Sequence, residues 1–147
     1  MRATAGERKR QIVEVATRMF ARHGYETVTV KELAHACDIT EPALYRHFRS
    51  KENVYGAVLD SLEARLDCDA LFARLEKETD LDKILTSLGK FIISFVRRNQ
   101  DVYRLLLYST LKKHTRAKRV YEVIRGRFVQ FLRQRLDDLF EQGQIIE

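Results

Sequence analysis

The chain has 147 residues, a formal net charge of +6 and a pI of about 9.5, a basic balance that suits a polyanionic partner such as nucleic acid or an anionic membrane surface. Hydrophobic residues make up 45% and charged residues 33%, which is enough apolar material for a folded core and too much for a disordered chain. One proline and 6 glycines favour long helices over many short strands, and two cysteines exclude a disulfide scaffold.

The first predicted helix runs from Glu7 to His23. Its apolar residues recur at helical spacing and form one stripe: Ile12, Val13, Ala16, Met19 and Phe20. Gly24 follows this stripe and can adopt the left-handed conformation that ends a helix.

A short helix is predicted next, over residues 30–37. Thr29 and Glu32 form a T-x-x-E capping box, with Thr29 as the N-cap residue. The helix that follows buries Leu33 and Ala34, and a tight turn at Asp38 ends it.

A second short helix is predicted over residues 41–48. Thr40 is its expected N-cap, and Pro42 is tolerated in the first turn, where its missing N–H costs little. Leu44 and Phe48 are four residues apart and face the core. Two short helices separated by a tight turn match the helix-turn-helix arrangement.

The remaining chain is also predicted to be helical. Ser50 caps a longer helix that continues through Leu66, and Thr79 with Asp82 caps a strongly amphipathic helix. A break at residues 99–101 precedes a short helix over residues 102–111. A last helix ends near Gly143 and carries an apolar stripe that includes Tyr121, Phe128, Leu132, Leu136 and Leu139.

Residues 29–52 closely resemble the DNA-binding signature of the TetR family. The strongest part is Leu44-Tyr45-Arg46-His47-Phe48 followed by Ser50-Lys51-Glu52, and the preceding helix is similar at Phe20, Gly24 and Tyr25. The specific match covers residues 8 to 55, whereas the later helices agree with the family only in length and order.

The resemblance implies an all-α protein with a three-helix DNA-binding head at residues 1–52 and a helical ligand-binding body at residues 53–147. In such heads the second helix of the motif enters the major groove and the first braces it. The DNA-contact candidates are the outward-facing residues of the motif: Thr29, Lys31, Thr40, Glu41, Pro42, Ala43, Tyr45, Arg46, His47 and Lys51.

These candidates divide into two kinds. Glu41 can accept a hydrogen bond from a cytosine amino group, and Pro42 and Ala43 can touch a thymine methyl group. The phosphate contacts that the resemblance implies are those of Tyr45, His47 and Lys51. Glu41 can alternatively be a first-turn charge that the helix dipole stabilises.

The resemblance also implies an effector cavity in the body. Its candidate lining residues are Phe91, Phe95, Tyr103, Leu107, Tyr121 and Phe128, each of which has plain core packing as its alternative. A basic cluster is either a solvated surface or a contact for an anionic effector or a distant phosphate: Lys112, Lys113, Arg116, Lys118 and Arg119.

We therefore expect a homodimeric repressor that binds a palindromic operator and is controlled by a small-molecule effector. The alternative is a helical protein-interaction module that retains a helix-turn-helix head. The effector, the operator and the target genes are not specified by the sequence, and activation remains open beside repression.

The sequence departs from the family pattern in two places. Asp38 stands in the turn where the family usually has glycine, and aspartate tolerates the left-handed conformation better than most residues. The family continues past the position of Gly143 into two dimer-forming helices, so this chain is truncated, dimerises differently or does not dimerise. We expect it to self-associate through its last helix or to bind DNA poorly, and a longer natural chain to exist.

Other classes of function lack support in the sequence. The 4 histidines have no metal-ligand spacing, and the 2 cysteines form no C-x-x-C pair, so we expect no metal. There is no phosphate-binding glycine loop or nucleophile elbow, so we expect neither a cofactor nor an enzyme. The apolar runs are too short for a signal peptide or a membrane span, which predicts a cytoplasmic protein without a membrane partner.

Overall fold

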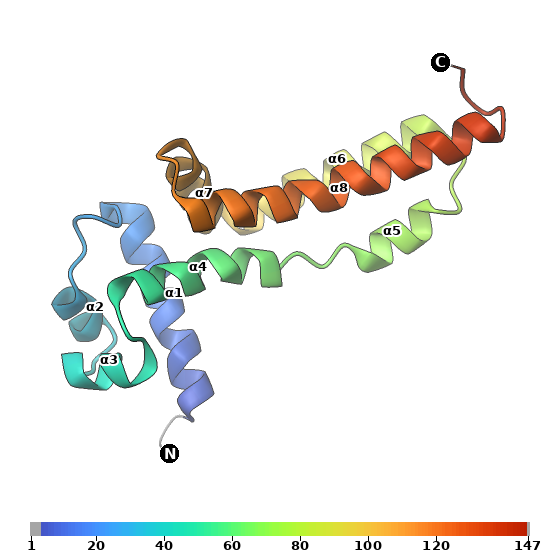
Figure 1. The fold of residues 1–147 in the computed structure, drawn as a ribbon. Coiled ribbons are helices and arrows are strands. Elements are labelled where there is room, and N and C mark those ends of the chain that lie inside the picture. The colour runs from blue at the N-terminus through green and yellow to red at the C-terminus, as the bar shows by residue number, and fades with distance from the viewer. Residues whose placement is uncertain (1–3, 147) are drawn as a thin grey trace.

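The computed structural model describes residues 4–146, and it confirms the predicted all-α class. Its helices are α1 (Ala5–His23), α2 (Val30–Ala36), α3 (Glu41–His47), α4 (Lys51–Ala64), α5 (Asp69–Leu75), α6 (Leu81–Arg98), α7 (Gln100–Leu111) and α8 (Thr115–Glu141). Residues 1–3 and 147, which the predicted head and body include, lie outside the described residues. Helices α1 to α3 gather at one end of the molecule, and α5, α6 and α8 extend away from them (Figure 1).

Capping explains where α1 begins and ends. The Thr4 hydroxyl accepts the Glu7 N–H at 3.2 Å, and the Glu7 carboxylate accepts the Thr4 N–H at 2.7 Å. This reciprocal pair starts α1 at Ala5, which is earlier than the predicted start at Glu7. At the other end Gly24 has φ 85, as expected for a residue that closes a helix without strain.

The helix-turn-helix forms with both predicted N-caps. The Glu32 N–H donates to the Thr29 hydroxyl at 3.2 Å, and the Ala43 N–H donates to the Thr40 hydroxyl at 3.3 Å. Asp38 lies in the turn with φ 54, the left-handed conformation predicted for it. Each short helix ends one residue before its predicted end, because the next residue leaves the helical conformation.

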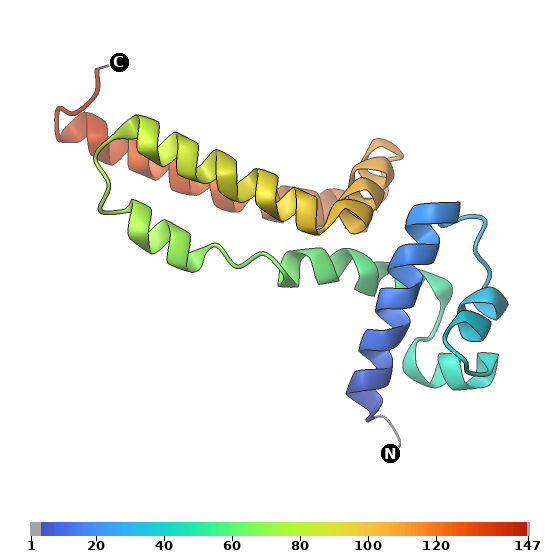
Figure 2. The same ribbon diagram turned by 180° about the vertical axis from the view of Figure 1, so that it is seen from behind.

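The head and the body share one hydrophobic core. Helix α1 packs on α4 and α7, and α4 packs on α8 (Figure 2). A single cluster of buried side chains runs from Ile12 in α1 through Val54 and Val58 in α4 to Ile124 in α8. The proposed boundary at residue 52 is therefore not marked by a gap in the core.

A second, smaller core joins the far ends of α5, α6 and α8. It consists of Leu75, Ile84, Leu88 and Leu139. Leu139 is fully buried, and the other members of the predicted α8 stripe are half-buried.

Three predicted boundaries in the body were wrong. Helix α4 ends at Ala64, and a separate short helix, α5, precedes the next connection. Asp80 rather than Thr79 caps α6, because its carboxylate accepts the N–H groups of Asp82 and Lys83 at 3.0 and 3.3 Å. Asn99 alone separates α6 from α7.

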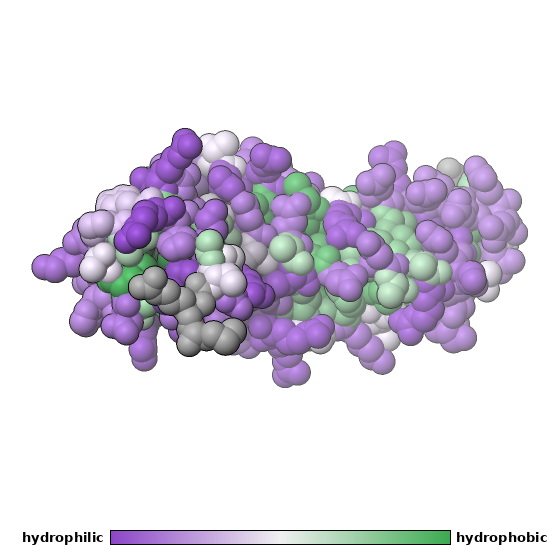
Figure 3. All heavy atoms as spheres, turned by 90° about the horizontal axis from the view of Figure 1, so that it is seen from below, coloured by the Kyte–Doolittle hydropathy of each residue, from purple (hydrophilic) through white to green (hydrophobic). Residues whose placement is uncertain are grey.

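The surface is hydrophilic at both ends of the molecule. Seen from below, hydrophobic residues are visible mainly over its middle (Figure 3). Between residues 4 and 146, no helix is both long enough and apolar enough to cross a membrane.

Candidate nucleic-acid interface

Helix α3 separates its buried residues from its exposed ones as predicted. Leu44 is fully buried and Phe48, just after the helix, is 8% exposed, whereas Tyr45 between them is 47% exposed. The remaining candidates on α3 are exposed or half-buried: Glu41, Pro42, Ala43, Arg46 and His47. The outward face of α3 therefore carries one carboxylate, a phenol, an imidazole and a guanidinium.

Three further candidates surround this face. Thr29 and Lys31 at the start of α2 and Thr40 before α3 are exposed. The Thr29 hydroxyl accepts the Glu32 N–H and donates to the Glu32 carboxylate at 2.8 Å, so capping uses its hydrogen-bonding capacity. The Thr29 backbone N–H also donates to the Glu32 carboxylate, at 2.7 Å, and this bond together with the hydroxyl bond lowers the pKa of Glu32. Thr40 accepts a bond in its cap and retains its hydroxyl proton for donation.

Lys51 has a structural contact that the sequence did not predict. Its ammonium donates to the backbone carbonyls of Tyr25 and Val28 at 2.9 and 3.0 Å and lies 4.4 Å from the centre of the Tyr25 ring. These contacts tie the first turn of α4 to the connection between α1 and α2. These bonds use two of its three N–H groups and leave one that can reach a phosphate. The phosphate contact of Lys51 therefore stays a prediction.

Replacing Lys51 by methionine measures the weight of these two roles. We expect a loss of about 1 kcal/mol in the free energy of unfolding, because two hydrogen bonds are lost while the apolar stem is kept. If Lys51 has this structural role alone, the salt dependence of DNA binding should stay unchanged. Thermal unfolding and titrations at several salt concentrations measure both. Lys31→Met, at an exposed residue proposed to contact phosphate, should instead lower the salt slope and keep the stability. A slope reduced by about one unit at unchanged stability would instead assign Lys51 to a phosphate.

The predicted effector-pocket residues lie in different surroundings. Phe95 is 5% exposed, Leu107 is 40% exposed, and four are half-buried against the main core: Phe91, Tyr103, Tyr121 and Phe128. Phe91 and Phe128 contact each other, with ring centres 5.9 Å apart. Of the six, Tyr121 lines an open depression on the surface beside Lys118 and Arg125. Their role in effector binding stays a prediction.

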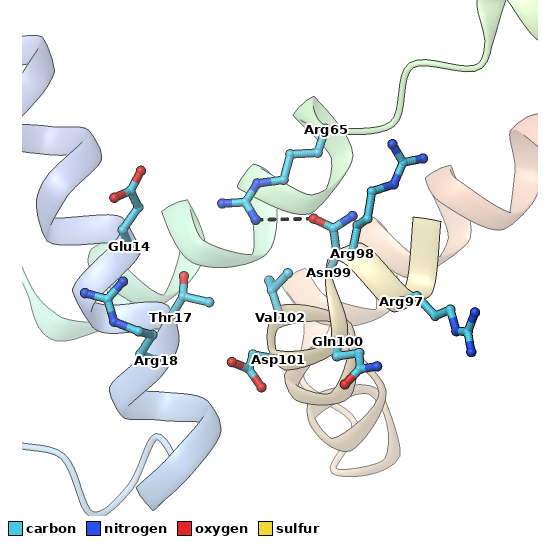
Figure 4. A pocket seen from close by; sticks show the side chains of 10 residues that line it. All are labelled: Glu14, Thr17, Arg18, Arg65, Arg97, Arg98, Asn99, Gln100, Asp101 and Val102. Carbon is cyan, nitrogen blue, oxygen red and sulfur yellow. Dashed lines mark hydrogen bonds between the residues drawn. The ribbon is translucent and has the colours of Figure 1, made fainter. Parts of the chain in front are cut away.

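An open depression lies between α1, the end of α4 and the α6–α7 corner (Figure 4). Arg65 spans it and donates to the Asn99 side chain at 3.2 Å, while Arg97 points away from the hollow. Its volume is about 430 Å³, and its arginines outnumber its two carboxylates, Glu14 and Asp101. The depression is basic and faces solvent.

Comparisons with known proteins agree with this geometry. Residues 12–58 match the family model of the bacterial regulatory proteins, tetR family. Nucleoid occlusion factor SlmA from Aliivibrio fischeri is 28% identical over 138 residues, which cover 87% of this chain and 68% of that protein. SlmA from Actinobacillus pleuropneumoniae is 32% identical over 101 residues, covering 68% of this chain and 50% of that protein.

Solved structures have the same fold. A transcriptional regulator of the TerR/AcrR family from Aquifex aeolicus has a TM-score of 0.70 at 21% identity, with 93% of this chain and 78% of that chain covered. A tetR-family transcriptional regulator from Streptomyces coelicolor has a TM-score of 0.65 at 23% identity, with 93% and 60% covered. The fold likeness thus extends beyond the head into the helices that follow it.

Proposed function

Because this chain is a TetR-family DNA-binding regulator, by its match to the family model over residues 12–58 and by its fold, we propose that it acts as a homodimeric repressor of a palindromic operator under the control of a small-molecule effector. The observation that carries the proposal is the outward face of α3, whose polar side chains are exposed or, at His47, half-buried, while Leu44 and Phe48 anchor the helix. The chain binds DNA and has no catalytic role in this proposal.

The exposed residues of the motif take two roles in the proposed complex. Glu41, Pro42 and Ala43, in the first turn of α3, meet base edges in the major groove. Tyr45 and His47, with Lys31 and Arg46, contact the phosphates and fix the position of the helix. The head at residues 1–52 is the DNA-binding unit, and the body at residues 53–147 holds the effector.

Binding to duplex DNA as a function of salt tests the proposal. A protein that neutralises several phosphates loses affinity steeply between about 50 and 200 mM salt. Recovery of bound chromosomal fragments from cells would give the operator and its neighbouring genes together. Absence of salt-dependent binding to any duplex, under conditions where the protein is folded, would overturn the proposal and favour the protein-interaction alternative.

Base readout is tested at Glu41. Replacement by glutamine keeps the size of the side chain but adds a donor and removes the charge, so the preferred base pair should change by about 1–3 kcal/mol at one position of each half-site. Selection from a random DNA pool, compared between wild type and Glu41→Gln, measures this change. Identical consensus sequences would remove Glu41 from the base contacts.

A second candidate function comes from the names of the relatives. The SlmA proteins that match 87% of this chain at 28% identity are named nucleoid occlusion factors. In this alternative the chain acts in nucleoid occlusion and does not regulate the genes beside the DNA that it binds. Transcript levels in a deletion strain separate the two: expression changes next to the bound sites support the repressor, and unchanged expression supports the alternative.

A further inference from the structure

A cavity of about 450 Å³ lies where the head meets the body, and we call it the junction pocket. The end of α1 and the connection after it form one wall, and α4, α7 and the α7–α8 corner form the others. Six of its lining residues carry the argument: His23, Tyr25, Tyr55, Tyr108, Lys112 and His114. The volume lies within the range of small-molecule sites, about 300–1,000 Å³.

The polar groups of the junction pocket have fixed hydrogen-bonding directions. Ser109 donates its only hydroxyl proton to the Leu105 carbonyl at 2.7 Å. In the bond between Tyr55 and Ser109, the Tyr55 phenol is therefore the donor and the Ser109 oxygen is the acceptor. Burial raises the pKa of Tyr55 to about 12, which keeps that proton in place. The Tyr55 side chain is 2% exposed, so its phenol group is held inside the wall of the pocket by this bond.

Aromatic rings and donors make up the rest of the wall. The Tyr25 and Tyr55 rings lie 4.4 Å apart, and the His114 ring meets Tyr55 edge-on at 5.1 Å. His114 Nδ1 accepts the Ala117 N–H at 3.4 Å, so the proton of the neutral imidazole lies on Nε2, which can donate. The Lys112 ammonium lies 4.8 Å from the centre of the Tyr108 ring.

We propose that the junction pocket binds a small aromatic carboxylate. The half-buried Tyr25 ring and the exposed Tyr108 ring offer surfaces on which a single aromatic ring can stack. Lys112 supplies the cation for the carboxylate, and it also faces the one carboxylate of the lining, Glu26, with which the ligand competes. The Nε2–H group of half-buried His114 can donate to a hydroxyl substituent on the bound ring. This pocket is separate from the body cavity predicted at Phe91 and Phe128.

The pocket is placed to affect DNA binding, a consequence that rests on the proposed function. Tyr25, one of its walls, is also the residue whose carbonyl and ring hold Lys51. A ligand that moves Tyr25 therefore moves the attachment between the first turn of α4 and the α1–α2 connection, directly after α3. If the ligand changes the affinity for DNA, DNA must change the affinity for the ligand by the same factor.

The test uses 4-hydroxybenzoate as the probe and the DNA-free protein. Because the chain contains 6 tyrosines and no tryptophan, tyrosine fluorescence together with calorimetry follows binding. Lys112→Met should weaken binding about tenfold or more, since it removes a charged hydrogen bond to the carboxylate. Lys112 is exposed, so this change leaves the fold intact.

Two controls define the site. Arg97→Met, at the edge of the open depression of Figure 4, should leave the affinity for 4-hydroxybenzoate unchanged. The uncharged 4-hydroxybenzamide should bind to the wild type about as weakly as 4-hydroxybenzoate binds to Lys112→Met. No saturable binding up to millimolar concentration, or equal affinities for wild type and Lys112→Met, would overturn the proposal. A DNA titration with and without the probe then tests coupling separately. Ligand binding that survives where DNA binding is absent supports the pocket and overturns the proposed function alone.

Discussion

With alanine in place of Leu44, we expect the head to lose about 2–5 kcal/mol of stability and the protein to lose specific DNA binding. Leu44 is fully buried and holds α3, a helix of 7 residues that is too short to be stable without packing. Natural domains are stable by only about 5–15 kcal/mol, so this loss removes much of the margin. Chemical denaturation followed by circular dichroism measures it.

The adjacent residue provides the matched control for this experiment. Tyr45 is 47% exposed, and Tyr45→Ala should change the free energy of unfolding by less than about 0.5 kcal/mol while weakening binding to all DNA sequences. The two variants thus separate packing from contact on one short helix. Equal stabilities for Leu44→Ala and the wild type would mean that α3 is not anchored through Leu44.

Replacing Arg135 by methionine should cost about 2–4 kcal/mol, the second large effect. The Arg135 side chain is buried in α8, and its guanidinium donates to the carbonyls of Leu75 and Glu78 at 3.3 and 2.7 Å. Methionine fills a similar space but leaves both carbonyls without this donor. Hydrogen exchange of the α5 amides and thermal unfolding measure the loss.

Arg133→Met is the control, because Arg133 is exposed on the same helix two residues earlier. It removes an equal charge without removing a buried donor, so it should leave the melting temperature nearly unchanged. If both arginine variants unfold at the same temperature, the bonds from Arg135 do not hold α5 and the α5–α6 connection to α8.

The head was predictable from sequence because its signals are local. Thr29 and Thr40 cap helices through residues three positions later, and Leu44 and Phe48 lie at helical spacing. Each of these features requires only the neighbouring chain, so the exposed face of α3 follows from them. The left-handed conformation of Asp38 was expected from the resemblance, because the family usually has glycine at this position of the turn.

The rest depends on partners far away in the chain. Lys51 binds carbonyls 23 and 26 residues earlier, and the Tyr55–Ser109 pair joins residues 54 apart. No periodic pattern contains such distances, so neither the contacts of Lys51 with these carbonyls nor the junction pocket was predicted. Helix α5 was missed because its N-cap, Cys68, makes no side-chain cap bond and leaves no capping signature.

Helix α8 is long enough to turn a small rotation at one end into a large displacement at the other. Its 27 residues rise by about 40 Å, from His114 at the junction pocket to the small core around Leu139. The two cores pack against opposite ends of the helix. A tilt of about 10° about the His114 end would move the far end, and the small core with it, by about 7 Å at this rise per residue. A small rotation at the junction pocket would thus displace the Leu139 end by more than the pitch of the helix.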